Sequence, residues 1–241
     1  MEILKSKNNP KIKHWHKLQD KKYRLQSKTF LIEGYHLVEE AIKHNLIVEI
    51  IESETNWKYK NSIKVSKDII EHLSTTKTPQ NILAECKFIT REIKFNKILI
   101  LNNLQDPGNI GTIIRLAKAF GFDSIAVENF DFYNPKVIRS SQGAFFDLNI
   151  FKISSSEEFI KQIKQQDFRV YATVLNQRAK KLNQTHFQQD KIAVVLGNEG
   201  NGISQQVQNI CDEWVYVPIE FESLNVACCA AIILNKIYNE S

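Results

Sequence analysis

A short run of apolar residues without polar interruption, Ile98-Leu99-Ile100-Leu101, most narrows the folds open to this chain. A strand that is apolar on both faces must be covered on both faces, as happens when helices pack on either side of a parallel sheet. Mostly apolar runs recur at 124–127, 148–151, 170–175, 192–196 and 214–217. Amphipathic helical patterns alternate with several of them. The alternation predicts an α/β domain with a mostly parallel sheet.

A smaller set of elements precedes this domain. Short strand candidates lie at 30–32, 47–51, 63–65 and 82–88, and helical patterns lie around 37–42 and 69–73. The charged stretch 91–94 reads as a connector. We therefore expect two domains, a small α/β domain at 1–90 and a larger one at 97–241.

Positive charge is concentrated at the N-terminus. Residues 1–28 hold nine Lys and Arg against Glu2 and Asp20, whereas the whole chain of 241 residues has a net charge of only +5. A basic arm on a near-neutral body suggests a polyanionic partner, with a solvated lysine-rich tail as the alternative. His14, Trp15 and His16 within this arm favour nucleic acid, since flat rings stack on bases.

Composition excludes several classes of protein. A hydrophobic content of 43% is enough for a buried core. No apolar run reaches the ~18 residues of a membrane span, and the N-terminus lacks a signal-like apolar stretch. The cysteines form no C-x-x-C pair and the histidines show no ligand spacing, so we expect no metal and a reducing cytoplasmic location. The four cysteines are Cys86, Cys211, Cys228 and Cys229.

The segment 106–115 follows the first apolar run and carries candidate chemistry. Pro107-Gly108 forces a turn, Gly111 permits close backbone approach, and Asn109 can cap the helix that follows. Arg115 lies six residues later and offers a planar fork to a phosphate oxygen or a developing oxyanion. The alternative is a capped helix with an exposed arginine.

Two further segments follow apolar runs near the C-terminus. Residues 196–202 contain three glycines in seven positions, with Glu199 inside the turn, and their spacing fits neither the dinucleotide fingerprint nor a Walker loop. Ser223-Leu224-Asn225-Val226 opens a final apolar helix that Ser223 or Asn225 can cap. A helix that is apolar almost all round is buried in the core or between subunits.

In identity, order and separation, these three segments resemble the three motifs of the SpoU (TrmH-type) RNA 2′-O-ribose methyltransferases, a branch of the SPOUT superfamily. Residues 134–143 are similar to a family segment between the first two motifs. Residues 30–34 and 78–80 resemble the small ribosomal-protein-like RNA-binding domain often fused to this family. The resemblance covers nearly the whole chain.

The resemblance implies a C-terminal domain with a deep trefoil knot, which binds S-adenosylmethionine, and an enzyme that works as a homodimer without metal. By position, the cofactor would contact the backbone around four residues. These are Thr173, Gly197, Ile219 and Leu224.

The implied reaction is methyl transfer to a ribose 2′-hydroxyl, with ribosomal RNA as the expected substrate and transfer RNA as the alternative. Arg115 would orient the target and stabilise charge as the oxygen attacks. Asn109, Glu199, Ser223 and Asn225 would hold the ribose, the loops and the arginine in register. Only Glu220-Phe221-Glu222 separates Ile219 from Ser223, where the family usually has a longer glycine-containing stretch. A catalytically inactive RNA-binding relative is therefore a further alternative.

Overall fold

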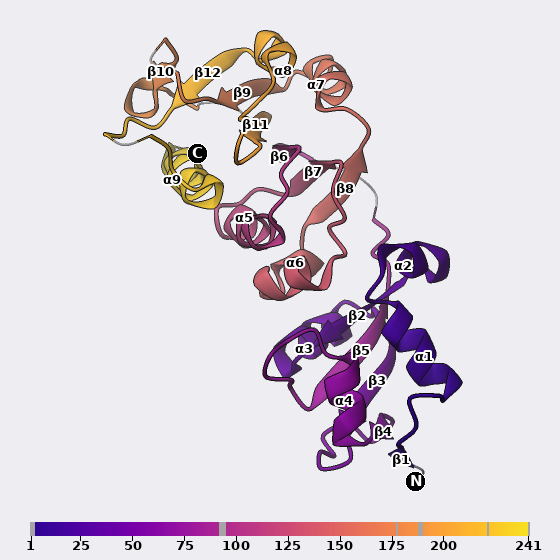
Figure 1. Cartoon of the computed structure of the whole chain (residues 1–241). Coiled ribbons are helices and arrows are strands. Elements are labelled where there is room, and N and C mark those ends of the chain that lie inside the picture. The colour runs from indigo at the N-terminus through magenta and orange to yellow at the C-terminus, as the bar shows by residue number, and fades with distance from the viewer. Residues whose placement is uncertain (1–2, 92–94, 177, 188–189, 221, 241) are drawn as a thin grey trace. The chain divides into compact units, whose positions relative to one another are not determined.

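The computed structural model describes residues 3–91, 95–176, 178–187, 190–220 and 222–240, and the expected connector at 92–94 lies outside them. The chain divides into two compact units (Figure 1). The N-terminal unit comprises residues 1–90 and 133–146, and the C-terminal unit comprises 91–132 and 147–241. Sequence analysis placed 133–146 in the larger domain, but its aromatic residues pack against Phe30 of the N-terminal unit.

The N-terminal unit contains a mixed five-stranded sheet. Its strands, in spatial order, are β1 (Ile3–Leu4), β4 (Ile63–Val65), β3 (Ile47–Ser53), β5 (Ile82–Lys87) and β2 (Thr29–Glu33). The strand β5 runs antiparallel to both of its neighbours, and the remaining pairs are parallel. The helices of this unit are α1 (Pro10–Lys17), α2 (Lys21–Ser27), α3 (Tyr35–Lys43), α4 (Lys67–Leu73) and α6 (Pro135–Ser140). A single 3-10 turn, Ala144–Phe146, follows α6.

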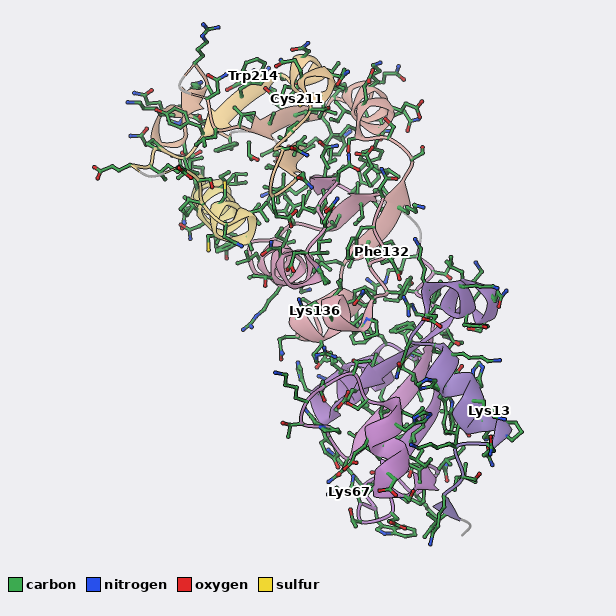
Figure 2. The ribbon with its side chains drawn as sticks, viewed as in Figure 1. Lys13, Lys67, Phe132, Lys136, Cys211 and Trp214 are labelled. Carbon is green, nitrogen blue, oxygen red and sulfur yellow. The ribbon has the colours of Figure 1, made fainter. Side chains whose placement is uncertain are left out.

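Residues 3–28 are folded, which contradicts the expected arm. Trp15 is only 1% exposed, packs in the core with Ile12 and Leu18, and donates its indole N–H to Glu85 at 3.0 Å. His14 bonds the same carboxylate, and His16 stacks on a histidine of α4. These rings are therefore already partnered within the fold. The lysines do remain on the surface, as Lys13 of α1 illustrates (Figure 2).

The C-terminal unit contains a seven-stranded sheet in which every pair is parallel, as predicted. Its strands, in spatial order, are β10 (Lys180–Lys181), β12 (Glu213–Tyr216), β9 (Arg169–Thr173), β11 (Ile192–Gly197), β6 (Lys97–Asn102), β7 (Ser124–Glu128) and β8 (Asn149–Ile153). The 3-10 turn Leu182–Gln184 follows β10.

Helices cover both faces of this sheet, as the uninterrupted apolar runs require. The helices α7 (Ser156–Lys164) and α8 (Gln205–Ile210) pack on one face, and α5 (Pro107–Ala119) and α9 (Val226–Glu240) pack together on the other (Figure 1). Ile98 and Ile100 point into the core beside α7, and the alternate residues Leu99 and Leu101 are equally buried. The two faces of the central strand β6 therefore each support a helical layer.

The N-termini of α7 and α4 differ in their capping. Ser155 caps α7 by accepting from the backbone N–H of Glu158. Ser66 precedes α4 without a side-chain capping bond. No helix in the part of the chain that the structure describes has the length and hydropathy of a membrane span.

Candidate active site

A cavity of about 630 Å³ opens in the C-terminal unit, at the carboxyl ends of β9, β11 and β12. This volume lies within the range of sites that bind small molecules and cofactors. The four residues expected near a cofactor, Thr173, Gly197, Ile219 and Leu224, all line it. Glu199, Ser223 and Asn225 line it too. Two of the three sequence segments therefore meet at one cavity.

The wall that follows β11 is a tight loop that only glycine permits. A Cβ at Gly197 would lie 2.5 Å from the carbonyl carbon of Gly202, far inside normal contact. Asn198 and Gly202 exchange both backbone hydrogen bonds, at 3.1 and 2.9 Å, and Gly202 has a φ of +66°. The Asn198 side chain accepts from the N–H groups of Gly200 and Asn201, both at 3.0 Å. The loop is thus closed before any ligand binds.

Asn109 joins the first segment to the other two. Its Nδ2 donates to the Glu199 carboxylate at 3.1 Å, and its Oδ1 accepts from Nδ2 of Asn225 at 2.9 Å. The backbone N–H groups of Gln105 and Asp106 also donate to Glu199, each at 3.2 Å. All three segments therefore meet through a single asparagine.

The Glu199 carboxylate is held in its ionised form. Partial burial favours the neutral acid, but the hydrogen bonds from Asn109, Asp106 and Gln105 outweigh it and keep the pKa of Glu199 below its ordinary value. An ionised carboxylate with three donors around it is an anchor for the loops and has no proton to give near neutral pH. Its position indicates a role in organising the site.

The caps of α5 and α9 differ in how well sequence analysis predicted them. Asp106, and not Asn109, caps α5 by accepting from the Asn109 N–H at 2.8 Å, which frees the Asn109 side chain for the site. Of the two predicted candidates, Asn225 caps α9, since its Oδ1 accepts from the N–H groups of Ala227 and Cys228. Asn225 therefore both starts the last helix and bonds to Asn109.

Arg115 lies apart from this network. It is exposed on α5, is not among the residues that line the cavity, and makes no hydrogen bond or ion pair with any residue that the structure describes. The other predicted catalytic residues are gathered together, whereas the Arg115 guanidinium has no side-chain partner among the described residues.

Sequence analysis missed residues that support the loop before α5. Asn103 and Asn129 follow β6 and β7 with φ values of +56° and +54°, and the Asn129 side chain donates to Asn103 Oδ1 at 2.8 Å. The Asn198 amide donates to the Asn103 carbonyl at 2.8 Å. Asparagine tolerates the left-handed conformation, so an asparagine two residues after an apolar run was the available signal.

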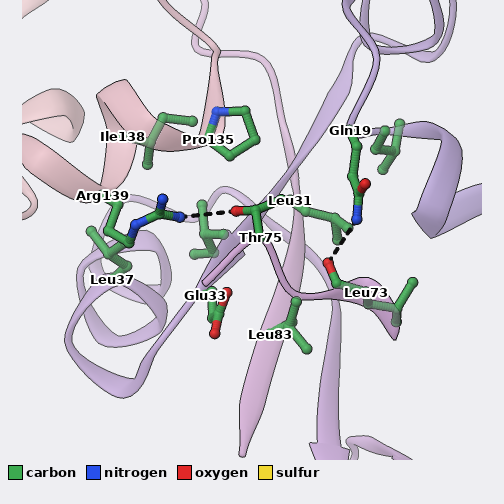
Figure 3. Close-up of a pocket in the computed structure, with 12 residues that line it drawn as sticks. Gln19, Leu31, Glu33, Leu37, Leu73, Thr75, Leu83, Pro135, Ile138 and Arg139 are labelled. Atoms are coloured by element: carbon green, nitrogen blue, oxygen red, sulfur yellow. Dashed lines mark hydrogen bonds between the residues drawn. The ribbon is translucent and has the colours of Figure 1, made fainter. Parts of the chain in front are cut away.

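The N-terminal unit holds a second, much smaller cavity of about 20 Å³ (Figure 3). Arg139 donates to Thr75 Oγ1 at 2.9 Å and Gln19 donates to the Leu73 carbonyl at 3.1 Å at its edge. A single water needs roughly 10–15 Å³ of such space, so this cavity has room for water and not for a cofactor.

Comparison with known proteins gives matches along most of the chain. Residues 96–235 match the model of the SpoU rRNA Methylase family, and residues 9–84 match the MRM3-like substrate binding domain. The 23S rRNA (guanosine(2553)-2′-O)-methyltransferase RlmP of Bacillus subtilis is 35% identical, over 97% of this chain and 98% of its own.

Solved structures share the fold. That of a putative RNA methyltransferase of the TrmH family from Porphyromonas gingivalis is 27% identical with a TM-score of 0.85, covering 97% of this chain and 99% of its own. The SpoU methyltransferase AviRb from Streptomyces viridochromogenes, solved in complex with the cofactor AdoMet, is 22% identical with a TM-score of 0.84. That match covers 96% of this chain and 98% of AviRb, and at this identity it establishes the common fold.

Proposed function

Because this chain belongs to the SpoU rRNA methylase family, we propose that it transfers a methyl group from S-adenosylmethionine to a ribose 2′-hydroxyl of ribosomal RNA. The observation that carries this proposal is the position of Asn109. Its bonds to Glu199 and Asn225 bring three distant segments to the rim of one cavity of cofactor size.

The cavity fits the cofactor in size and in chemistry. Apolar side chains such as Leu224 and Ile219 suit a purine ring, and the adjoining loop supplies backbone and amide groups for polar atoms. When bound, S-adenosylmethionine supplies the activated methyl group. Thr173 and Gly197 also line the cavity, and Thr173 Oγ1 is fixed by a 2.8 Å bond to the Val195 carbonyl. AviRb, which shares this fold, binds that cofactor.

The protein's own residues position the reacting groups and stabilise the charge that develops between them. Ionised Glu199 anchors Asn109, and Asn109 with Asn225 fixes the start of both site helices. Ser223 lines the cavity just before α9, and on this proposal it helps to hold the ribose. Arg115 steers the ribose or its phosphate and stabilises the negative charge that grows on the attacking oxygen.

On this proposal, Arg115 acts within a homodimer. The helix α9 exposes Ile232 (42%) and Tyr238 (54%) beside α5, and large apolar side chains at the surface favour association. A twofold contact through α5 and α9 buries these side chains and brings Arg115 to the cavity of the second copy. The trefoil knot and the cytoplasmic location stay predictions.

Ribosomal RNA is the proposed substrate class. The match of residues 9–84 to the MRM3-like substrate binding domain and the 35% identity to RlmP both support it. The exposed lysines of α1 and α2 supply the positive charge that any RNA substrate requires.

Tritium transfer from labelled S-adenosylmethionine tests the proposal. Ribosomal and transfer RNA from a strain lacking this gene are incubated with the protein, and labelled sites are mapped by their resistance to alkaline cleavage. We expect label in ribosomal RNA alone. Label only in transfer RNA supports the alternative substrate, and cofactor binding without any transfer identifies an inactive relative.

A further inference from the structure

Trp57 is an exposed ring in the N-terminal unit, whereas Trp15 is buried. It is 60% exposed on the loop between β3 and β4. An exposed indole presents a flat face on which a nucleic-acid base can stack. Sequence analysis did not single out this residue.

The indole is fixed in place on one side. Its Nε1–H donates to the Glu54 carbonyl at 3.1 Å, and the Lys64 ammonium lies 4.5 Å from the ring centroid. The Lys64 side chain is completely buried, so the ring and its loop cover this charge. One face of the ring is therefore occupied by a cation, while much of the ring remains in solvent.

The loop beneath the ring is built around a buried carboxylate. Glu52 is fully buried, pairs with Lys64 at 2.6 Å, and accepts from Ser62 Oγ at 2.5 Å. It also accepts from Asn56 Nδ2 and from the backbone N–H groups of residues 58 and 59, at 3.0–3.2 Å. A buried ion pair is a poor source of net stability compared with apolar packing, but it fixes geometry through many directed bonds. The loop is thus rigid before anything binds.

Unpaired positive charge lies along the same part of the chain. Lys60 is exposed and has no hydrogen bond or ion pair with the residues that the structure describes. Lys5 and Lys7 are exposed directly after β1, whose Leu4 pairs in register with Val65 at the end of β4. The Glu54 N–H donates to the Val65 carbonyl, so Glu54, whose carbonyl anchors Trp57, lies at the same carboxyl end of β4.

We propose that the free face of Trp57 stacks on an unpaired base of the RNA substrate while Lys60 contacts a neighbouring phosphate. This inference rests on the proposed function, because it assumes an RNA substrate. A ring already immobilised by Glu54 and Lys64 loses little freedom on stacking, which favours binding. Stacking accepts any base, so Trp57 adds affinity for unpaired RNA and little sequence preference.

Binding of the full chain to poly(A) and to the duplex poly(A)·poly(U) tests the inference. Trp57→Leu should weaken poly(A) binding at least about fivefold and leave duplex binding within about twofold, since only the single strand offers free base faces. Trp57→Phe keeps a ring and should retain most of the affinity. Lys60→Gln should weaken the binding of poly(A) and of the duplex by the same factor. Unchanged poly(A) binding by Trp57→Leu, or an equal loss on both ligands, overturns the proposal.

Fluorescence gives a second measurement that needs no disruptive variant. Poly(A) should quench the tryptophan emission of the wild-type chain and protect it from iodide, and Trp57→Phe should remove this response. Quenching that persists in Trp57→Phe assigns the signal to another tryptophan and refutes the stacking. The methyl-transfer assay is separate: failure to methylate any RNA with poly(A) stacking intact refutes the function and leaves the binding site standing.

Discussion

The side-chain amide of Asn225 donates a 2.9 Å hydrogen bond to Asn109 Oδ1, although 116 residues separate the two. The Asn109 amide then donates to Glu199 at 3.1 Å. Asparagine is both donor and acceptor, so one side chain can join an amide to a carboxylate. A carboxylate at position 109 would have no proton to donate, so it could not form the hydrogen bond to Glu199.

Asn109→Asp therefore places a second negative charge beside Glu199 while keeping the size of the side chain. We expect a fall in methyl-transfer rate on the order of 10²-fold, because α5, which carries Arg115, and the start of α9 at Asn225 shift out of register. Single-turnover rates with ribosomal RNA measure this. Thr112→Ala, at an exposed position of the same helix, is the control and should keep the wild-type rate. Full activity of Asn109→Asp would show that the network is dispensable.

Arg115→Ala should abolish turnover and leave cofactor binding near the wild-type value. Loss of one charge-stabilising donor typically lowers the rate by about 10²–10³. Arg115→Lys should recover only part of it, since an ammonium lacks the planar fork. Calorimetry with S-adenosylmethionine and tritium transfer give the two readouts. Equal loss of both would make Arg115 a structural residue.

Mixed dimers test whether Arg115 serves the second copy. Leu224→Arg should block the cavity and inactivate the protein, as Arg115→Ala does by another route. In a mixed dimer, one site keeps an intact cavity and receives an intact Arg115, so activity should return on mixing. Two inactive proteins that stay inactive when mixed, with dimer exchange verified, would place Arg115 at the cavity of its own chain.

The lowered pKa of Glu199 predicts how the stability of the protein depends on pH. Its folded-state pKa lies below the ordinary 4.5, so its contribution to stability is present above about pH 4.5 and is lost as pH falls through the folded-state value. Glu199→Gln removes this contribution. The difference in unfolding free energy between wild type and Glu199→Gln should thus be largest near neutral pH and shrink in acid. Urea unfolding at several pH values measures it, and a difference that grows in acid would contradict the assignment.

Local patterns predicted the C-terminal sheet well, for a physical reason. A strand covered on both faces is apolar at nearly every position. Each strand, such as Ile98 to Leu101, could therefore be predicted from its own segment alone. Contacts such as that of Asn198 with Asn103 could not be predicted in this way, because they depend on β11 lying beside β6. Strand order is a property of the whole fold and leaves little trace in either segment.

At the N-terminus, the high density of charged residues obscured a helix that packs into the core. Its many lysines suggested an arm, yet Ile12, Trp15 and Leu18 recur every third residue, which is a helical stripe. The helix places this stripe inward and the lysines outward. Trp57 was missed for the opposite reason, since a lone aromatic residue in a polar loop gives no periodic signal.

The surface lysines, and not the segment as a whole, should set the salt dependence of RNA binding. Deleting residues 1–28 would remove core residues such as Trp15 and unfold the N-terminal unit. Replacing Lys13, Lys17 and Lys21 by Gln leaves the core intact. Each lost phosphate contact should flatten the slope of log affinity against log salt by about 0.7–0.9. An unchanged slope in filter binding would assign these lysines to solubility alone.

The buried pair of Glu52 and Lys64 should respond differently to single and double replacement. Lys64→Met leaves the Glu52 carboxylate buried without its cation, which should destabilise the N-terminal unit by about 3–5 kcal/mol. Replacing Glu52 by Leu as well removes the stranded charge and should recover much of that loss. Urea unfolding of the two single variants and the double variant measures the coupling.

The double variant also separates stability from geometry. It lacks the carboxylate that bonds residues 56, 58, 59 and 62, so the loop under Trp57 should loosen even where unfolding stability is restored. We therefore expect weaker poly(A) binding than wild type at equal stability. A double variant no more stable than Lys64→Met would mean that the bonds of Glu52, and not its charge, sustain the fold of this unit.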